Sequence, residues 1–217
     1  IDGVGRYRDA SGVLNGMGQT SELCWLGVFD SAGLMTGYEQ LSVGPDGATE
    51  RMLWESLGYN AIGLNAGFRE VTVRNGSALN RTVRTRTRIG YDPFDQVARY
   101  NETVLDKRGL TTETRRTATE YNALEQMVKY AEVRTNSAKA GYVTEMDRYW
   151  TDYNESGQVT GYGELSHEVG PNLPGYGLEL DSEVRTTMSD LTYDKFGRQI
   201  GEVALTERDS EGYVEVL

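Results

Sequence analysis

The sequence contains very few of the residues that build disulfide frameworks, metal centres and general-base sites. Its 217 residues include one cysteine, one histidine and four prolines. A lone Cys24 excludes an internal disulfide framework and any multi-cysteine metal site. A lone His167 excludes the usual zinc-ligand sets and most general-base arrangements. Because the sequence also has no D-x-D-x-D-G calcium loop, we predict a chain without catalytic, metal-binding or cofactor-binding residues.

Long apolar stretches are also lacking. No uninterrupted apolar run approaches the roughly 18 residues of a membrane-spanning helix, so we predict no membrane span. The first residues, Ile1–Val4, show neither an initiator methionine nor a charged-then-apolar signal pattern. We therefore expect any targeting segment to have been removed.

Positive charge is scarce: 22 Lys and Arg residues stand against 33 Asp and Glu, and the formal net charge is −11. Binding to nucleic acid depends on Lys and Arg that neutralise phosphates, so we predict no nucleic-acid partner. Hydrophobic residues make up 38% of the chain, with four Phe and three Trp against 14 Tyr. This content is thin for a deep globular core, but it suits a broad, half-solvated β-sheet.

What the sequence does contain is an internal repeat of an aromatic residue followed by Asp or Asn. The aromatic anchors are Phe29, Tyr59, Tyr91, Tyr121, Tyr153 and Tyr193. Their spacings are 30, 32, 30, 32 and 40 residues, and a degenerate copy begins at Arg8. Nine and eleven positions after the first five anchors stand Tyr38 and Gln40, Phe68 and Glu70, Tyr100 and Glu102, Tyr130 and Glu132, and Tyr162 and Glu164. Agreement at so many offsets indicates a repeat protein of about seven repeats.

Each repeat is expected to form a β-hairpin. Arg84, Arg86 and Arg88 alternate with Thr and Ile residues, and this period of two is typical of a strand. The Asp/Asn-x-x-Gly segment at each anchor predicts a tight turn in which the glycine has a positive φ. We expect this conformation at Gly33, Gly63, Gly157 and Gly197.

Two segments test this interpretation. Asp95 and Glu125 replace the turn glycine in two copies, and Glu125 is expected to be strained or to use another turn. Residues 48–57 contain good helix formers. They nevertheless occupy a position that other repeats fill with strand-favouring threonines, so we predict a strand there.

The sequence therefore predicts an all-β fold: an antiparallel meander of repeated β-hairpins, with about 30–32 residues per repeat, that forms an extended or superhelical ribbon. We predict a single β-repeat domain over residues 1–217. The longest spacing between anchors contains an insertion at 167–175 with two of the four prolines, Pro171 and Pro174. This insertion is expected to be an exposed loop.

The clearest copies of the repeat are residues 193–198, which read Tyr-Asp-Lys-Phe-Gly-Arg, and residues 153–158, which read Tyr-Asn-Glu-Ser-Gly-Gln. They resemble the YD repeat of bacterial RHS proteins, and the resemblance extends over nearly the whole chain. It implies a long ribbon of β-strands in a large secreted or surface-exposed bacterial protein. It implies no catalytic residues.

Three features allow a chemical as well as a structural interpretation. His167 has no recognisable nucleophile or orienting acid in the sequence, so an exposed loop histidine is the preferred interpretation. Cys24 lies in an apolar stretch and is predicted to be a small buried hydrophobic residue rather than a reactive thiol. The recurring Tyr-x-Glu pairs could bind a ligand. Because they share one strand face, we expect stacked tyrosines, with the glutamates facing arginines of neighbouring strands.

We therefore predict a non-enzymatic structural building block of an extracellular fibre or surface filament. Joining residues 213–217 to residues 1–7 of a next copy would complete one strand and keep an anchor spacing of 32, so the predicted partners are further copies, assembled head to tail. One alternative is an adhesin-type binding module that recognises surface glycans. Another is an RHS-like shell wall around a cargo. The predicted location is extracellular or at the cell surface.

Overall fold

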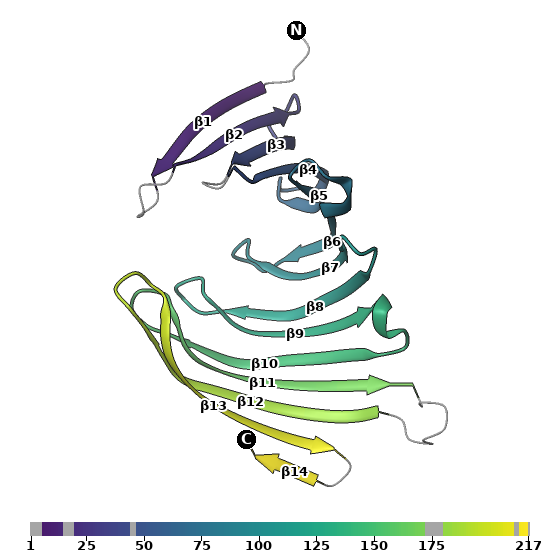
Figure 1. Cartoon of the computed structure of the whole chain (residues 1–217), viewed down its shortest axis with the longest axis vertical. Helices are drawn as coiled ribbons and strands as arrows, with labels where there is room; N and C mark the ends of the chain where they lie inside the picture. The colour runs from purple at the N-terminus through teal and green to yellow at the C-terminus, as the bar shows by residue number, and fades with distance from the viewer. Residues whose placement is uncertain (1–5, 15–19, 44–46, 172–179, 211–212, 217) are drawn as a thin grey trace. The chain divides into compact units, whose positions relative to one another are not determined.

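The computed structural model describes the backbone of residues 6–14, 20–43, 47–171, 180–210 and 213–216. It describes the side chains of residues 26–43, 47–77, 79–171 and 181–207. Apart from turns and two short 3₁₀ helices, these residues form β-strands. Each strand pairs with its neighbour in the sequence, in the order β1 to β14, which confirms the predicted antiparallel meander of hairpins (Figure 1).

The chain divides into two compact units, which we describe separately where the sequence predicted a single domain over 1–217. Unit 1 comprises residues 1–90 and 101–112, and unit 2 comprises residues 91–100 and 113–217. Unit 1 contains β1 (Arg6–Leu14), β2 (Thr20–Phe29), β3 (Met35–Val43), β4 (Thr49–Tyr59), β5 (Asn65–Arg74), the 3₁₀ helix η1 (Ala78–Asn80) and most of β6 (Arg81–Tyr91). The strand β7 (Val97–Leu105) contributes to both units. Unit 2 contains most of β8 (Thr111–Tyr121), then β9 (Met127–Asn136), η2 (Ser137–Lys139), β10 (Val143–Tyr153), β11 (Val159–Gly170), β12 (Leu180–Tyr193), β13 (Gln199–Ser210) and β14 (Tyr213–Val216).

The Asp or Asn side chain after each anchor builds the hairpin turn. In the first of these turns, Asp30 Oδ1 accepts hydrogen bonds from the backbone N–H groups of Ala32 and Leu34, at 2.8 and 2.9 Å. The backbone N–H of Gly33 donates to the Asp30 carbonyl at 3.1 Å. The same side-chain pattern recurs after the other anchors at Asn60, Asp92, Asn122, Asn154 and Asp194, and also at Asp106 in the turn between β7 and β8. The side chain therefore fixes the turn independently of the residues between its ends.

The positive φ expected at the turn glycines is confirmed. The φ angles of Gly33, Gly63, Gly157 and Gly197 are 82°, 85°, 77° and 78°. Asp95 and Glu125 adopt the same conformation, with φ of 64° and 63°. Glu125 thus uses the common turn with a strained backbone, because Asn122 makes the same two hydrogen bonds as its counterparts.

This turn geometry predicts opposite effects for two substitutions. Glu125→Gly should stabilise the protein by roughly 0.5–1 kcal/mol, because glycine adopts a positive φ without steric strain. Gly157→Val should destabilise it by about 1 kcal/mol or more, because a β-branched residue disfavours that φ. Urea unfolding followed by circular dichroism measures both changes. Two variants with wild-type stability would contradict the strained-turn interpretation.

Strands that lead into the anchors are interrupted by β-bulges. Register shifts occur between Ser56 and Gly58, between Arg148 and Trp150, and between Ser189 and Thr192. Arg88, Ala118 and Asp190, each three residues before an anchor, have positive φ angles of 53°, 52° and 53°. An extra residue in a strand reverses the face that later side chains occupy. It thereby places an anchor tyrosine on the same face as the residue five positions before it.

Two local predictions have different outcomes. The strand predicted at 48–57 in place of a helix is confirmed, because β4 covers Thr49–Tyr59. The exposed loop predicted at 167–175 is wrong in its first part, because residues 167–170 belong to β11 and pair with β12. The residue before a proline favours extended backbone, so the strand continues up to Pro171. Residues 172–179 lie outside the described part of the chain.

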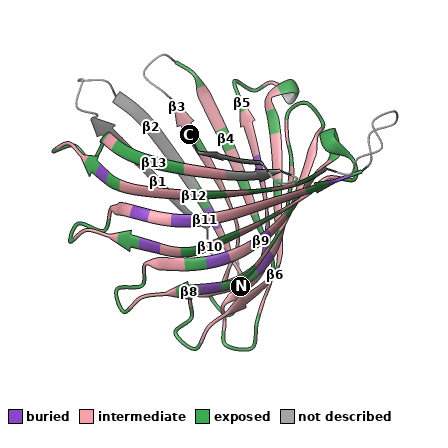
Figure 2. Cartoon of the chain, turned by 90° about the horizontal axis from the view of Figure 1, so that it is seen from below, coloured by how far each residue is buried: buried purple, intermediate pink, exposed green. Residues whose placement is uncertain are grey.

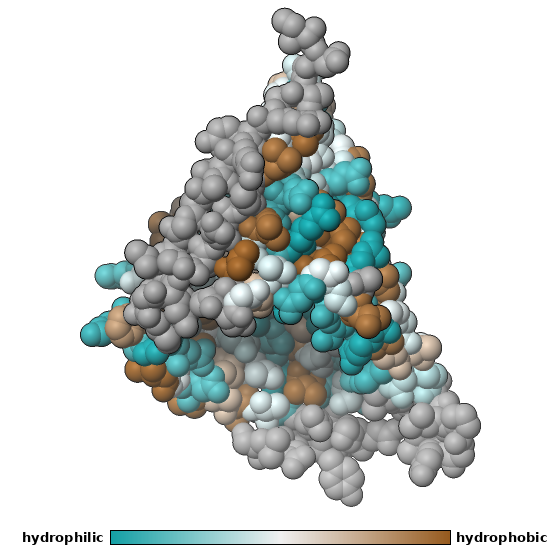
Figure 3. Space-filling view, turned by 45° about the horizontal axis from the view of Figure 1, so that its top comes forward, coloured by the Kyte–Doolittle hydropathy of each residue, from teal (hydrophilic) through white to brown (hydrophobic). Residues whose placement is uncertain are grey.

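Little of either unit is deeply buried. Among the described residues, the buried hydrophobic side chains are Val71, Tyr100, Tyr130 and Leu191, and no large side chain is completely enclosed. In unit 2, buried positions lie along β7 to β12 (Figure 2). Apolar and polar side chains are interspersed on the face shown in Figure 3. Each hairpin is therefore stabilised mainly by contacts with its neighbours rather than by a separate core.

Candidate functional site

Unit 2 carries a row of alternating tyrosine and arginine side chains across five strands. The guanidinium carbon of Arg116 lies 5.3 Å from the ring centre of Tyr100 and 4.2 Å from that of Tyr130. The same carbon of Arg148 lies 5.5 Å from the Tyr130 ring and 3.9 Å from the Tyr162 ring. We call these five residues the tyrosine–arginine row. Each cation–π contact contributes roughly 0.5–1 kcal/mol at a partly exposed site.

Each arginine of the row also pairs with a glutamate of the following strand. Arg116 Nη2 lies 2.8 Å from Glu132 Oε2, and Arg148 Nη2 lies 2.8 Å from Glu164 Oε2. Unit 1 contains the equivalent contact, with Arg86 Nη2 at 2.7 Å from Glu102 Oε2. All three pairs join residues 16 positions apart in the sequence. The pairing is therefore part of the repeat.

Stacked aromatic rings take the place of this alternation in unit 1. The ring centres of Tyr38 and Trp54 are 5.5 Å apart, and those of Trp54 and Phe68 are 6.0 Å apart. The guanidinium carbon of Arg86 lies 5.5 Å from the Phe68 ring. Trp54 occupies the repeat position, five residues before an anchor, that holds arginine at 86, 116 and 148.

These contacts confirm that the recurring tyrosines and glutamates pack across strands, as their shared strand face predicted. The stacked tyrosines of that prediction are replaced in unit 2 by tyrosines that alternate with arginines. Sequence reasoning missed the three arginines as members of the repeat. The signal was present, because Arg86, Arg116 and Arg148 each stand five positions before an anchor.

The anchor tyrosines tie each hairpin to the preceding one. The hydroxyl groups of Tyr121, Tyr153 and Tyr193 donate to the carbonyls of Val97, Met127 and Val159 at 2.8, 2.5 and 2.8 Å. In unit 1, the Tyr59 hydroxyl donates to the Met35 carbonyl. Burial raises the pKa of Tyr121 and of Tyr153, so both hydroxyls remain protonated donors over the physiological range.

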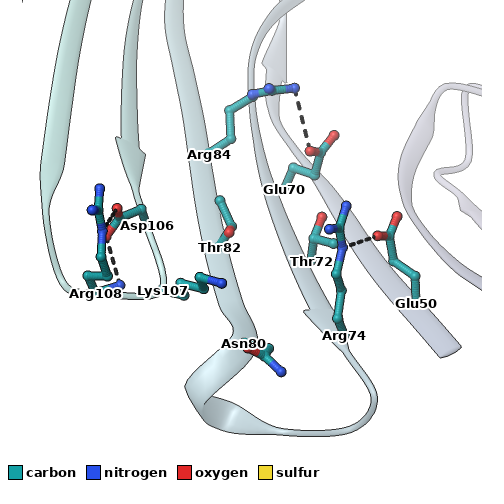
Figure 4. A pocket seen from close by; sticks show the side chains of 10 residues that line it. All are labelled: Glu50, Glu70, Thr72, Arg74, Asn80, Thr82, Arg84, Asp106, Lys107 and Arg108. Atoms are coloured by element: carbon teal, nitrogen blue, oxygen red, sulfur yellow. Dashed lines mark hydrogen bonds and ion pairs between the residues drawn. The ribbon is translucent and has the colours of Figure 1, made fainter. Parts of the chain in front are cut away.

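A polar hollow of about 530 Å³ lies within unit 1. It is lined by Glu50, Glu70, Thr72, Arg74, Asn80, Thr82, Arg84, Asp106, Lys107 and Arg108 (Figure 4). These residues come from β4, β5, η1, β6 and the turn between β7 and β8. All of them carry polar or charged side chains, so the hollow offers hydrogen-bond donors and acceptors to a polar ligand.

Arginine side chains neutralise the carboxylates of this hollow. The pairs are Arg74 Nε with Glu50 Oε2 at 2.7 Å, Arg108 Nε with Asp106 Oδ2 at 3.0 Å, and Arg84 Nη1 with Glu70 Oε1 at 3.6 Å. Hydrogen bonds from the backbone N–H groups of Leu110 and Arg108, together with the Arg108 side chain, hold the pKa of Asp106 below its usual range. Each carboxylate of the hollow therefore has a guanidinium nitrogen within 3.6 Å.

His167 and Cys24, the two residues that the sequence analysis weighed for reactivity, lie on different strands. His167 lies on β11, half-exposed, with its Nε2 2.6 Å from Asp181 Oδ1 on β12. Glu145 and Glu183 are its partners on the strands at either side. The Cys24 backbone is part of β2 and pairs with Ala10 and Leu41. The Cys24 side chain lies outside the described residues, so its predicted burial stays a prediction.

The acidic surroundings of His167 predict a pH-dependent contribution to stability. The hydrogen bond to Asp181, together with Glu145 and Glu183, raises the pKa of His167 above 6.5. Because the folded-state pKa exceeds the unfolded one, this stabilisation is complete below about pH 6.5 and is lost as the pH rises through the folded-state pKa. The stability difference between wild type and His167→Gln should therefore be larger at about pH 5.5 than at about pH 8.5 in urea unfolding. A difference independent of pH would contradict the assignment.

The sequence matches no protein-family model, and comparisons with curated proteins and with solved structures give no significant match. Among the described residues, no group of three or more His, Cys, Asp or Glu side chains is placed to hold a metal ion. No helix in the described part of the chain is long and apolar enough to cross a membrane.

Proposed function

We propose that this chain is a non-enzymatic structural building block of an extracellular fibre or surface filament, related to the YD-repeat proteins that its sequence resembles. The observation that carries the proposal is the use of the repeated side chains. The arginines and glutamates pair with each other 16 residues apart, and the anchor tyrosines bind the preceding hairpin. If these repeated side chains served to bind a ligand, we would expect them to be free to contact it rather than paired with one another.

The thin core supports the same proposal. Few described side chains are buried, and the contacts that recur are those between neighbouring hairpins. Repeat proteins of this kind gain stability from each added neighbour, and their ends need a partner or a cap. A chain built in this way can be lengthened by adding further hairpins or further copies at its ends.

The two ends of the strand order offer edges for such extension. β1 and β14 are the first and last strands of the order. In the described part of the chain, β14 pairs only with residues 207–210 of β13, so residues 199–206 have no partner strand on that side. Unpaired strand edges readily form backbone hydrogen bonds with another chain. Addition of a hairpin at these edges would give the head-to-tail arrangement.

Self-association tests this proposal. Sedimentation velocity over a range of concentrations, with negative-stain electron microscopy, should show end-to-end oligomers or filaments. The double variant Val203→Lys/Leu205→Lys places charge on the open part of β13, where both side chains are exposed, and should weaken assembly by about tenfold or more. Leu124→Lys, at an exposed hairpin tip of the same unit, is the matched control and should assemble normally. A chain that stays monomeric at every concentration would refute the proposal.

The second candidate is an adhesin-type binding module. The observation that favours it is the polar hollow of unit 1, because most of its ten lining side chains, unlike Glu70 and Asp106, do not belong to the repeated positions. A carbohydrate is the ligand class whose hydroxyl groups match such a lining.

A further inference from the structure

We propose that the hollow of unit 1 binds an acidic sugar residue, one that carries a carboxylate or a sulfate group. This inference deepens the adhesin candidate and rests on it, whereas the fibre proposal is independent of it. The hollow contains Arg74, Arg84, Lys107 and Arg108 against three carboxylates. The lining of the hollow therefore has an excess of positive charge, although the whole chain has a net charge of −11. This local excess favours an anionic ligand.

Lys107 supplies the uncompensated charge. It extends from the β7–β8 turn toward the strand that carries Thr82 (Figure 4). Its ammonium group makes no ion pair within the described part of the chain, whereas the three arginines each have a carboxylate partner. An anion entering the hollow would meet this charge without displacing an existing partner.

The arginines add directed hydrogen-bond donors. Arg74 and Arg108 pair through Nε, and their side chains remain 72% and 71% exposed. A guanidinium has five N–H donors in a planar fork that matches the two oxygens of a carboxylate or sulfate. Arg84 contacts Glu70 and Glu102 only at 3.6 Å. The hollow thus presents guanidinium N–H donors that these ion pairs leave available to a ligand.

The neutral part of the lining indicates a sugar rather than a simple ion. Thr72, Thr82 and Asn80 offer hydroxyl and amide groups that can both donate and accept hydrogen bonds. The carboxylates of Glu50 and Glu70 can accept hydrogen bonds from sugar hydroxyls. A volume of about 530 Å³ lies within the range of small-molecule sites and greatly exceeds the size of an inorganic anion.

Isothermal titration calorimetry on the intact chain tests this site. The probes are a sulfated heparin disaccharide, a digalacturonic acid and neutral maltose. We expect saturable binding of one or both acidic disaccharides, weakened by added salt, and no binding of maltose. Lys107→Glu should weaken acidic-sugar binding by about tenfold or more, because it reverses the charge that no partner compensates.

Lys195→Glu is the matched control. Lys195 holds the same position in its Asp-x-x-Gly turn as Lys107 does in its own turn. The two substitutions change the net charge of the chain by the same amount. Lys195, however, lies beside Phe196 in unit 2. The affinity of the Lys195→Glu variant for the acidic disaccharides should stay within about twofold of the wild-type affinity. Arg84→Gln is a second site variant, and circular dichroism checks that each variant folds.

The outcomes separate the proposals. Equal weakening by Lys107→Glu and Lys195→Glu, or equal binding of maltose, would overturn the acidic-sugar site. Acidic-sugar binding that neither Lys107→Glu nor Arg84→Gln affects would place the site elsewhere and leave the adhesin candidate standing. Failure of all three probes to bind would overturn the site, and a glycan array without saturable signal would overturn the adhesin candidate with it. Neither result bears on the fibre proposal.

Discussion

Arg116→Met should destabilise unit 2 by about 2–3 kcal/mol. This is the largest loss of stability that we expect from any single substitution proposed for this chain. Arg116 is the partner of Glu132, whose side chain is only 4% exposed. Removing one member of a buried ion pair leaves an uncompensated charge and costs about 3–5 kcal/mol. Arg134 also contacts Glu132, with Nη2 at 2.6 Å from Oε1, and moderates this cost. Loss of the cation–π contacts with Tyr100 and Tyr130 adds to it.

Arg115→Met is the matched control, because Arg115 is the exposed neighbour on the same strand. It should change the free energy of unfolding by no more than about 0.5 kcal/mol. The double variant Arg116→Met/Glu132→Met removes both charges and should recover at least half of the loss. Urea unfolding of the wild type, Arg116→Met, Glu132→Met and the double variant gives the coupling energy. Equal effects of Arg115→Met and Arg116→Met would contradict the role assigned to the row.

The hairpins could be predicted because each depends on residues close together in the sequence. One turn is defined by an Asp or Asn residue, a positive φ three residues later and strands of alternating pattern on both sides. None of these features depends on the rest of the chain. Even Glu125 follows this rule, with φ of 63°. There, the two hydrogen bonds of Asn122 outweigh the strain of a non-glycine residue.

The tyrosine–arginine row could be predicted only in part. The tyrosines and glutamates are visible as repeat offsets, but the arginines lie before the anchor, and a bulge separates them from it. With a strict period of two, Arg116 and Tyr121 would occupy opposite faces. The bulge at Ala118, with φ of 52°, brings them to the same face. Nothing in the local sequence around Ala118 indicates that extra residue.

The hollow could not be predicted at all. Its residues lie as far apart in the sequence as Glu50 and Arg108, and they converge through the registers of β4 to β6. The pairs Glu50 with Arg74 and Glu70 with Arg84 follow from strand register. Register depends on the whole set of cross-strand contacts.

The incorrect prediction of a loop beginning at His167 has a simpler cause. Pro171 ends the strand only at its own position, so residues 167–170 can still pair as part of β11.

Replacing Thr119 and Thr151 together with valine should stabilise unit 2 by about 2 kcal/mol, roughly 1 kcal/mol for each site. Both side chains are buried, at 8% and 6% exposure. Their hydroxyl oxygens have no hydrogen-bond partner among the described residues and are enclosed by protein atoms. A buried hydroxyl without a partner loses its hydration and gains nothing in return. Valine has nearly the same shape without the hydroxyl.

The repeat itself supports this expectation. Two positions before the anchors Tyr59, Tyr91 and Tyr193 stand Leu57, Ile89 and Leu191, whereas Gly27 precedes Phe29, so three of the four other repeats have an aliphatic side chain at this position. Leu191 is buried, at 8% exposure. Valine at 119 and 151 would therefore restore the side-chain type that the fold accommodates there, with a strong preference for extended backbone.

Thr117→Val provides the control, because Thr117 lies on the same strand as Thr119 but is exposed. Its hydroxyl is hydrated, so the substitution should change stability by less than about 0.5 kcal/mol. Thermal and urea unfolding of the single and double variants should show additive gains at 119 and 151. A double variant less stable than wild type would mean that both hydroxyls have hydrogen-bond partners in solution. The assignment of Thr119 and Thr151 as buried hydroxyl groups without partners would then be wrong.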